Sequence, residues 1–332
     1  NASISHTVTT YAELVSALSG APAGHVIYIP EGANINLTGK PYLAIPAGVT
    51  IASNRGSNGS QGGRIFKLRV TSDECGMALY ANGDNVRITG IRLEGPDKEA
   101  MGYYCPMTGI RNSDISPEGR LIVDNNEIWG WSFAAVRIYQ PNATQMAKGM
   151  ADAELGSSIA NIHHNFIHHC QDTGYGYGVV VAWGPALIKG NIFDYTKHAV
   201  ACGGYAGEGY EASYNIHLGH NIYQVFDVHG SDYGGNRIAG TLYRIHHNSI
   251  QNANRYGVNV RGVPINQVII TNNELTSCTS DMCRTWVPNG THPIWQSYRG
   301  ITGFTNISVK KNLIDGVYSA SGPEYFEYPG WD

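Results

Sequence analysis

The chain has 332 residues, of which only 14% are charged, and its formal net charge at pH 7 is -4. Glycine (41 residues) and tyrosine (21 residues) are abundant, a composition that favours turns and strands over helices. No stretch reaches the roughly 20 apolar residues of a membrane span, and no basic block suits a nucleic acid. We therefore expect an all-β protein whose partner is neither a membrane nor a nucleic acid.

The first predicted elements in the chain are a short helix and two strands. Thr10 and Glu13 form a capping-box pattern, which predicts a helix over residues 11–18. Apolar runs over residues 26–29 and 49–52 then predict strands. A helix at the end of a stack of strands covers an edge that would otherwise expose unpaired backbone groups. We therefore expect this helix to cap the fold.

A repeated strand motif, in which an asparagine is followed by an apolar residue, occupies most of the remaining chain. The repeat asparagines are Asn126, Asn165, Asn191, Asn215, Asn248, Asn273 and Asn312. Three of the six spacings between them are 26, 24 and 25 residues, about one turn of a solenoid built from three short strands. We expect each asparagine at a bend between strands, in the left-handed conformation, with the amides of successive coils hydrogen-bonded into a ladder.

The N-terminal segments, over residues 11–18, 24–29 and 49–56, resemble the beginning of pectate-lyase-like β-helix proteins. Together with the asparagine repeat, the resemblance covers most of the chain. It implies a single right-handed parallel β-helix domain over residues 1–332, with the short helix as its N-terminal cap. The superfamily contains polysaccharide lyases, glycoside hydrolases, carbohydrate epimerases and phage tailspikes. The resemblance therefore implies a polysaccharide substrate, which we expect a monomer to bind, but it leaves the reaction open.

Six cysteines and six Asn-X-Ser/Thr sequons indicate a secreted protein with disulfide bonds and N-linked glycans. The order of the cysteines favours the pairs Cys75–Cys105, Cys170–Cys202 and Cys278–Cys283, and the alternative is buried free thiols. The sequons begin at Asn1, Asn36, Asn58, Asn142, Asn289 and Asn306. We expect an extracellular location.

A second apolar strand follows each repeat strand, beyond a variable loop. Five copies can be aligned, over residues 135–139, 178–182, 198–202, 225–229 and 257–261. Because side chains alternate along a strand, the inward set is predicted to be Val136, Ile138, Val179, Val181, Ala199, Ala201, Phe226, Val228, Val258 and Val260. The outward set is then Arg137, Tyr139, Val180, Ala182, Val200, Cys202, Asp227, His229, Asn259 and Arg261. Outward rows on stacked strands predict a long groove for a polymer.

The outward polar residues predict the chemistry, which we expect to be β-elimination on a uronate-containing glycan. Arg261 would neutralise the sugar carboxylate, His229 would take the C5 proton, and Asp227 or Asn259 would orient His229. Tyr139 or Tyr214 would protonate the leaving oxygen. The predicted catalytic residues are therefore His229, Asp227, Arg261, Glu211 and Tyr139. The predicted substrate-binding residues are Arg137, Lys197, His198, Asn259, Asp232, Trp183 and Tyr214.

Three other functions compete with a lyase. An inverting hydrolase needs two carboxylates roughly 6.5–9.5 Å apart, for which Asp227 with Asp232 or Glu211 are the candidates. The Gly-Asp-Asp setting that a resemblance to polygalacturonases would imply is absent from the sequence. A C5 epimerase would share the proton abstraction, and Asp227-Val-His229 loosely resembles the Asp-Pro-His-Asp motif of alginate epimerases. A non-catalytic glycan-binding solenoid would need no coupled His–Asp–Arg group.

Three pairs of adjacent histidines suggest a metal site: His163-His164, His168-His169 and His246-His247. Adjacent side chains on a strand point in opposite directions, so a pair cannot hold one ion unless the chain bends. We therefore assign the pairs to repeat composition and predict no metal ligands and no cofactor. The resemblance to lyases allows calcium, although no dense acidic cluster in the sequence supports it.

Overall fold

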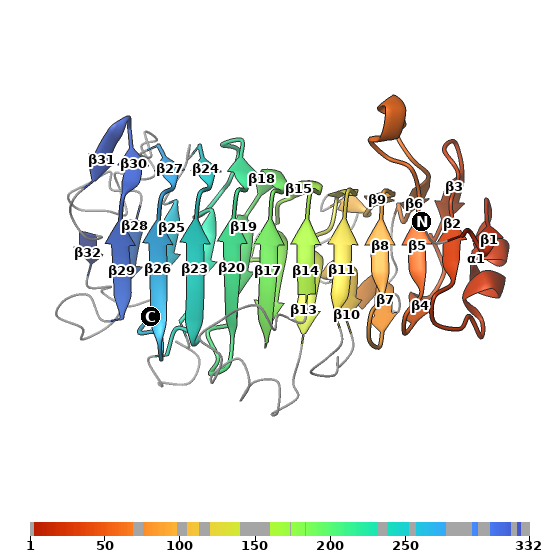
Figure 1. Cartoon of the computed structure of the whole chain (residues 1–332), viewed down its shortest axis with the longest axis horizontal. Helices are drawn as coiled ribbons and strands as arrows, with labels where there is room; N and C mark the ends of the chain where they lie inside the picture. Colours follow the sequence, from red (N-terminus) through yellow and green to blue (C-terminus); the bar gives the residue numbers. More distant parts are fainter. Residues whose placement is uncertain are drawn as a thin grey trace.

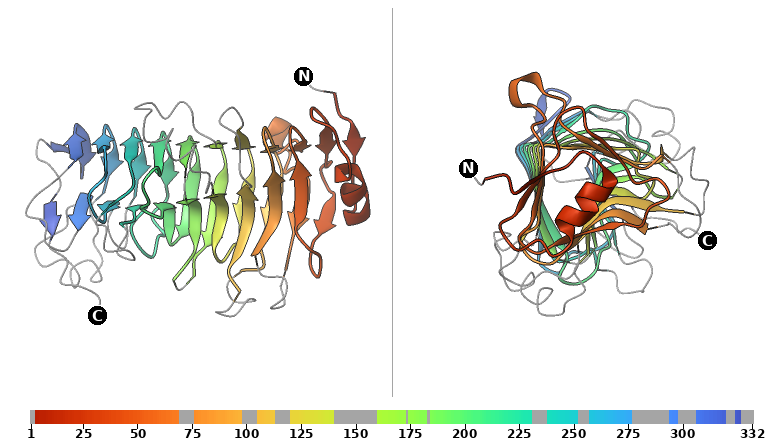
Figure 2. Two further views of the ribbon diagram at one scale, coloured as in Figure 1. Left: turned by 90° about the horizontal axis from the view of Figure 1, so that it is seen from below. Right: turned by 90° about the vertical axis from the view of Figure 1, so that its right-hand side faces the viewer.

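The chain forms a stack of coils, and its strands build three long parallel sheets that run along the molecule (Figure 1). The computed structural model describes residues 3–68, 76–97, 105–112, 120–139, 160–172, 174–182, 184–230, 238–251, 257–276, 294–297, 306–319 and 324–326. Successive strands of each sheet come from successive coils, so the coils are stacked along one axis as a solenoid (Figures 1 and 2). The predicted right-handed parallel β-helix is confirmed.

The strands of the three sheets follow one another in a fixed order within each coil. Sheet A contains β1 (His6–Thr7), β2 (Val26–Tyr28), β5 (Thr50–Ala52), β8 (Arg87–Thr89), β11 (Leu121–Asp124), β14 (Ala160–His163), β17 (Pro185–Lys189), β20 (Gly209–Ser213), β23 (Leu242–His246), β26 (Gln267–Thr271) and β29 (Ile307–Lys310). Sheet B contains β3 (Asn34–Asn36), β6 (Arg64–Phe66), β9 (Arg92–Glu94), β12 (Glu127–Trp129), β15 (Phe166–Cys170), β18 (Ile192–Thr196), β21 (Ile216–His217), β24 (Ser249–Ile250), β27 (Glu274–Leu275), β30 (Asn312–Ile314) and β31 (Val317–Ser319). Sheet C contains β4 (Leu43–Pro46), β7 (Gly76–Asn82), β10 (Met107–Asn112), β13 (Ala134–Tyr139), β16 (Tyr177–Ala182), β19 (His198–Cys202), β22 (Phe226–Val228), β25 (Val258–Val260), β28 (Ile294–Ser297) and β32 (Glu324–Phe326).

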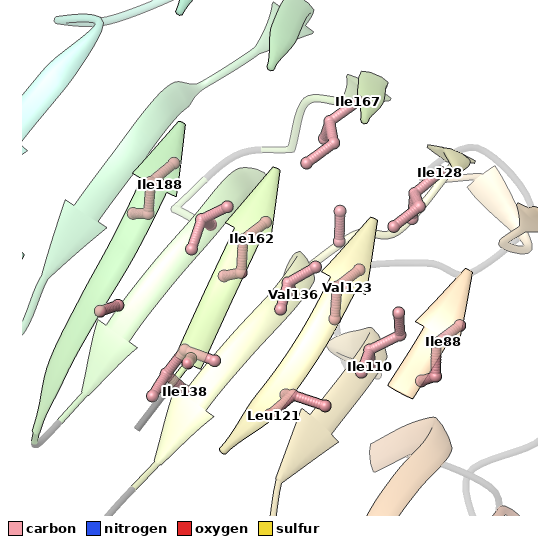
Figure 3. Packing of buried hydrophobic residues seen from close by; sticks show 14 of the residues in the cluster. Ile88, Ile110, Leu121, Val123, Ile128, Val136, Ile138, Ile162, Ile167 and Ile188 are labelled. Atoms are coloured by element: carbon pink, nitrogen blue, oxygen red, sulfur yellow. The ribbon is translucent and has the colours of Figure 1, made fainter. Parts of the chain in front are cut away.

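The core is a continuous apolar column enclosed by the three sheets. Figure 3 shows isoleucine, leucine and valine side chains from several coils meeting inside the solenoid, among them Val123, Ile128 and Val136 from one coil. Each of these three is fully buried, and each comes from a different sheet. Because one coil buries its apolar side chains largely against the next coil, stability depends on stacking rather than on a local core.

The predicted N-terminal helix is α1 (Tyr11–Leu18), and it closes one end of the column (Figure 2). The Thr10 hydroxyl accepts a hydrogen bond from the Glu13 amide (3.3 Å), and the Glu13 carboxylate accepts one from the Thr10 amide (3.2 Å). This is the predicted capping box. Leu14 and Leu18 are buried toward the strands. Within the described residues, no helix has the length and apolar character of a membrane span.

The repeat asparagines form the predicted ladder at the bend between sheets A and B. The Asn215 side-chain oxygen accepts hydrogen bonds from the backbone and the side-chain amide of Asn191, both 3.0 Å long. Asn215 in turn donates to the side-chain oxygen of Asn248, and it also donates to the Ile188 carbonyl at 2.9 Å. The same pattern links Asn126 to Asn312, and every ladder asparagine is buried.

The predicted left-handed conformation belongs to the residue before each ladder asparagine, so the expectation that the asparagine itself adopts it is wrong. These preceding residues, with φ between 54° and 64°, are Asn125, His164, Gly190, Tyr214, His247, Asn272 and Lys311. The bend also overturns the expectation that adjacent histidines point in opposite directions. His164 and His247 lie in this bend, and His169 has a φ of 52° within β15, so each turns its ring back toward the preceding histidine.

The predicted facing of β19 is right for Ala199 but wrong from Val200 to Cys202, whereas the other four aligned strands have the expected apolar core residues. Val200 is paired with Phe226, and Ala201 is paired with Asp227. Val200 and Cys202 therefore pack in the core, whereas Ala201 joins a separate outer cluster with Ala134 and Val180. The error arises because Ala199 and Val200 both face the core, which breaks simple alternation at the start of the strand.

The expected Cys170–Cys202 disulfide is wrong. Both residues are free thiols, because Cys170 ends β15 in sheet B and Cys202 ends β19 in sheet C of the next coil. Burial raises the pKa of Cys170 to about 12 and that of Cys202 further still, so both thiols stay protonated and inert. Cys75, Cys278 and Cys283 lie outside the described residues, and the two other pairs stay predictions.

Candidate active site on the outer face of sheet C

The outer face of sheet C carries a row of residues that the strand register aligns across six coils. We call this the outer row, and it consists of Arg111, Arg137, Val180, Ala201, Asp227 and Asn259. The predicted placement of Arg137 on the same face as Asp227, some coils away, is confirmed. Neighbouring parallel strands are about 4.8 Å apart, so Arg137 and Asp227 are separated by about 14 Å.

Both carboxylate oxygens of Asp227 accept hydrogen bonds from neighbouring side chains. Asp227 accepts hydrogen bonds from Arg261 Nε at 2.9 Å and Nη2 at 2.7 Å, and its Oδ1 also accepts one from Gln224 Nε2 at 2.9 Å. The carboxylate is 1% exposed, and burial alone would raise its pKa. The charge of Arg261, joined at low pH by those of protonated His198 and His229, outweighs burial and holds the pKa of Asp227 well below its usual range. Asp227 is therefore an anchor for Arg261 and is poorly suited to donate or accept a proton.

His198 lies next to the carboxylate of the Asp227–Arg261 pair and is neutral near pH 7. Its Nδ1 donates to the Gln224 carbonyl at 2.6 Å, and its Nε2 is 3.6 Å from Asp227 Oδ2. Burial lowers the pKa of His198 to about 4, although Asp227 acts in the opposite direction. The Tyr177 ring stacks on the imidazole with 5.6 Å between centroids. His198 is thus a buried support for the site rather than an exposed sugar-binding group.

His229 lies beside Arg261, one residue beyond the end of β22. The Arg261 amide donates to the Val228 carbonyl at 2.8 Å, and the backbone of Gly230 packs directly against the Arg261 carbonyl. The contact of His229 Nδ1 with the Gly230 carbonyl, at 2.6 Å, requires Nδ1 to carry a hydrogen and to donate it. In a neutral imidazole Nε2 then carries the lone pair, which is the form that a general base needs.

A pair of stacked arginines occupies the other end of the outer row. The Arg111 and Arg137 guanidinium groups lie over the Tyr139 ring, at 4.7 and 5.2 Å from its centroid, and Arg137 also lies 5.0 Å from the centroid of Phe133. The Nε atoms of both arginines are buried without a hydrogen-bond partner. Burial, and then the charge of Arg111, lower the pKa of Arg137, and only the phenols of Tyr139 and Tyr175 oppose this. A ligand anion would satisfy both arginines.

Aromatic rings connect the two ends of the site. Phe133 and Tyr177 pack over Val180 and Ala201, the buried middle of the outer row. The Phe133 ring lies 5.6 Å from that of Tyr177, which in turn stacks on His198. A chain of contacts therefore links Arg137 to Asp227 through Phe133, Tyr177 and His198. Aromatic rings therefore line this part of the outer face, and the long groove stays a prediction.

Three predicted site residues lie away from Asp227. Glu211 belongs to β20 in sheet A, where it contacts Arg244 (3.8 Å) and His246 (3.4 Å). Tyr214 is 53% exposed and lies at the bend between sheets A and B. Tyr139 belongs to the arginine pair, three coils from the reaction centre expected at His229. Asp232 and Trp183 lie outside the described residues.

Lys197, which was predicted to bind substrate, precedes His198 in the chain and lies over the rings of Tyr177 and Tyr223. Its Nζ donates to the Gly174 carbonyl at 2.7 Å and lies 5.1 Å from the centroid of the Tyr223 ring. Tyr223 and Tyr177 flank His198 and were not predicted. Arg111 was also missed, although strand 107–112 could have been aligned with strand 135–139 by matching Ile110-Arg111 to Val136-Arg137.

The site has no obvious metal centre in the described part of the chain, where no group of three or more histidine, cysteine, aspartate or glutamate side chains could hold an ion. In strands β4 to β28 of sheet C, Asp227 is the only acidic residue. Chemically, the arrangement offers cations for anionic groups, a partly exposed imidazole, His229, with the tautomer of a base, and aromatic rings. Calcium stays an expectation from the resemblance.

The Asp227–Arg261 pair should make stability depend on pH. We expect Arg261→Gln to cost about 3 kcal/mol at pH 7, because it leaves a buried carboxylate without its cation. Since the folded pKa of Asp227 is lowered, the pair stabilises above the unfolded pKa of about 3.9 and is lost as pH falls further. Without Arg261, burial raises the pKa of Asp227, so the deficit should shrink between pH 7 and pH 4.

Urea unfolding of the wild-type protein and the Arg261→Gln variant at pH 7, 5.5 and 4 would measure directly how much stability the variant has lost. Arg137→Gln is the matched control, because Arg137 is on the same face and has no carboxylate partner. A deficit that is equal at all three pH values would contradict the assignment of Asp227 as the charged partner.

Three solved structures with a similar fold are right-handed parallel β-helix proteins. An alginate lyase from Paenibacillus sp. str. FPU-7 is 17% identical, with a TM-score of 0.48, and the match covers 91% of this chain and 99% of that one. A pectate lyase, Pel9A, is 10% identical over 96% of this chain and 82% of that one, also with a TM-score of 0.48. A hyperthermoactive exopolygalacturonase from Thermotoga maritima is 12% identical over 92% and 87%, with a TM-score of 0.44. No protein-family model and no curated protein matches the chain. These similarities concern the fold alone.

Proposed function

We propose that the chain is a secreted polysaccharide lyase that cleaves a uronate-containing polymer by β-elimination. One observation carries the proposal: Asp227, the only acidic residue within the described strands β4 to β28 of sheet C, is bonded to Arg261 beside His229, and Arg111 and Arg137 lie on the same face. A site for hydrolysis needs two working carboxylates. A site for β-elimination needs a cation at the sugar carboxylate and a base, and we assign these roles to Arg261 and His229.

In the proposed reaction Arg261 binds the carboxylate of the sugar at the cleavage point. A guanidinium has five N–H donors, and Asp227 uses two of them. Pairing of the substrate carboxylate with the positive charge of Arg261 would stabilise the charge that develops when C5 loses its proton. Because Asp227 holds the guanidinium in place, the cation is oriented before the substrate binds.

His229 Nε2 takes the C5 proton in this proposal. The C4–O bond then breaks, a C4=C5 double bond forms, and the leaving oxygen needs a proton. Tyr177 and Tyr223 are the phenols beside His198, and they replace Tyr139 and Tyr214 as candidates for this acid. Arg111 and Arg137 would bind a second uronate about three coils away, a separation that suits a polymer and exceeds the size of one sugar.

The test is incubation with alginate, polygalacturonate and neutral polysaccharides, with ultraviolet absorbance and reducing ends followed together. We expect both signals to rise on a uronate polymer, because each β-elimination creates one conjugated double bond at the new non-reducing end and one new reducing end. Reducing ends that rise without absorbance would replace the lyase by a hydrolase. Absence of both signals from every uronate polymer would contradict the proposal.

We expect the double variant Arg111→Gln/Arg137→Gln to raise KM on the uronate polymer by about 10–100-fold, since two charge-assisted hydrogen bonds are lost. The matched control, Arg64→Gln, removes an arginine of sheet B. A methyl-esterified polymer lacks the carboxylates, so its KM should not change. An equal loss on the esterified and the charged polymer would exclude a carboxylate subsite.

A further inference from the structure

Two of the adjacent histidine pairs have the geometry of a bidentate metal site. The Nδ1 atoms of His168 and His169 are 2.7 Å apart, and those of His246 and His247 are 2.9 Å apart. Metal–nitrogen bonds of about 2.0–2.1 Å that meet at about 90° place their nitrogens about 2.9 Å apart, whereas a tetrahedral angle separates them by about 3.3 Å. The observed spacing therefore fits square-planar or tetragonal coordination.

The first histidine of each pair is oriented by a carboxylate. His168 Nε2 lies 3.3 Å from Glu127 Oε1, and His246 Nε2 lies 3.4 Å from Glu211 Oε1. A ligand histidine commonly donates its other N–H to a carboxylate in this way, which fixes the tautomer and increases the basicity of the metal-binding nitrogen. In both pairs the donated hydrogen is on Nε2, so the lone pair is on Nδ1 and faces the neighbouring imidazole.

Stacking holds the rings in these positions. The Trp129 indole lies parallel to His168, at 7° and 5.6 Å, and Tyr195 stacks on His169 at 4.5 Å. Tyr214 stacks on His247 at 5.0 Å. Both second histidines are exposed, so an ion can reach them from solvent. Rings that are already oriented lose little entropy when they bind an ion.

We propose that His168–His169 and His246–His247 each bind one Cu²⁺ ion through both Nδ1 atoms, with water completing the coordination. Cu²⁺ combines the preferred tetragonal geometry with the highest affinity of the divalent first-row metals for imidazole. These sites lie in sheets A and B and are separate from the outer row of sheet C. An N–H···N hydrogen bond between the two rings is the competing explanation of the short contact, and it requires no ion.

The third pair provides an internal comparison. His163 and His164 have a similar Nδ1 separation, 2.8 Å. However, His163 is paired with Lys189 on the next strand, and the nearby carboxylate, Asp124, is bonded to Arg87 and Thr89. The Arg87–Asp124 contacts, at 2.8 and 2.7 Å, are much closer than the contacts of Glu127 with Arg55 (3.7 Å) and of Glu211 with Arg244 (3.8 Å), so Asp124 is the carboxylate least able to orient a ligand histidine. We expect this pair to bind Cu²⁺ at least tenfold more weakly.

Calorimetric titration of the full chain with Cu²⁺ should give two tight equivalents, and electron paramagnetic resonance should show two coordinated imidazole nitrogens per ion. His169→Asn and His247→Asn should each remove one equivalent. Asparagine suits the left-handed conformation, as Asn125 and Asn272 show in the same fold. The matched control, His164→Asn, should leave both tight equivalents in place. Glu127→Gln should weaken the first site by about 10–100-fold.

Binding that both asparagine variants leave unchanged would overturn the proposal, and so would an absence of tight binding by the wild-type chain. Three equal equivalents would overturn the role given to Glu127 and Glu211. The nitrogen count is measured on the wild-type protein, so the proposal can be tested even if a variant fails to fold.

Discussion

Replacement of His229 by glutamine should lower kcat on the uronate polymer by about 10²–10⁴-fold and change KM little. Glutamine preserves much of the side-chain volume but cannot take a proton, and general-base catalysis typically contributes a factor of this size. The structural basis is the Nδ1 contact with the Gly230 carbonyl, which places the lone pair of the neutral imidazole on Nε2, the proposed acceptor of the C5 proton. Steady-state kinetics, with absorbance at saturating and limiting polymer, separates kcat from KM.

The matched control is His220→Gln. His220 is a half-exposed histidine bonded to Asp194, outside sheet C, and we expect its loss to leave kcat unchanged. A fall in kcat of less than about threefold for His229→Gln would remove His229 from the reaction and transfer the base role to another group. Equal falls for both variants would indicate a general loss of folded protein.

The fold could be predicted because the solenoid requires the same residue at the same place in every coil. Asn191, Asn215 and Asn248 each satisfy the backbone of a neighbouring coil, so the need for hydrogen bonds appears in the sequence as a periodic asparagine. The capping box of Thr10 and Glu13 is equally local, which is why the helix was also predicted correctly.

The errors concern details that depend on neighbouring coils. Several residue types, including His164 and Tyr214, occupy the left-handed position, so composition alone does not reveal it. In β19, Ala199 and Val200 both face the core, and a one-residue irregularity of this kind reverses the predicted face of every later residue. Cysteine order cannot show that Cys170 and Cys202 lie in different sheets.

The candidate site was predicted where its residues lie on aligned strands and missed where they do not. Asp227 and Arg261 were placed together because their strands are adjacent and in register. Glu211 was grouped with them by proximity in sequence, although β20 belongs to sheet A. Gln224 and Tyr223 precede β22 in a connection whose path no periodic pattern reveals, and they were missed.

Removal of one ladder amide should be the most destabilising small substitution in the fold. We expect Asn215→Ala to lower the free energy of unfolding by about 3–6 kcal/mol. It leaves the Asn191 backbone amide, the Asn191 side-chain amide and the Ile188 carbonyl buried without their partner. Each orphaned group costs about 1–3 kcal/mol, and coils stacked on both sides leave little room for water to replace the amide. Urea unfolding followed by circular dichroism measures the loss.

Two further variants test whether the cost follows the number of orphaned groups. Asn126→Ala should cost about two thirds as much, because it orphans two backbone groups, the Ile91 amide and the Ile88 carbonyl. Asn272→Gly changes an exposed asparagine in the left-handed position next to the ladder. Glycine adopts this conformation without strain, so the variant should lose less than about 1 kcal/mol of stability. If all three variants lost similar stability, the effect would stem from the bend itself, and the ladder hydrogen bonds would not be its cause.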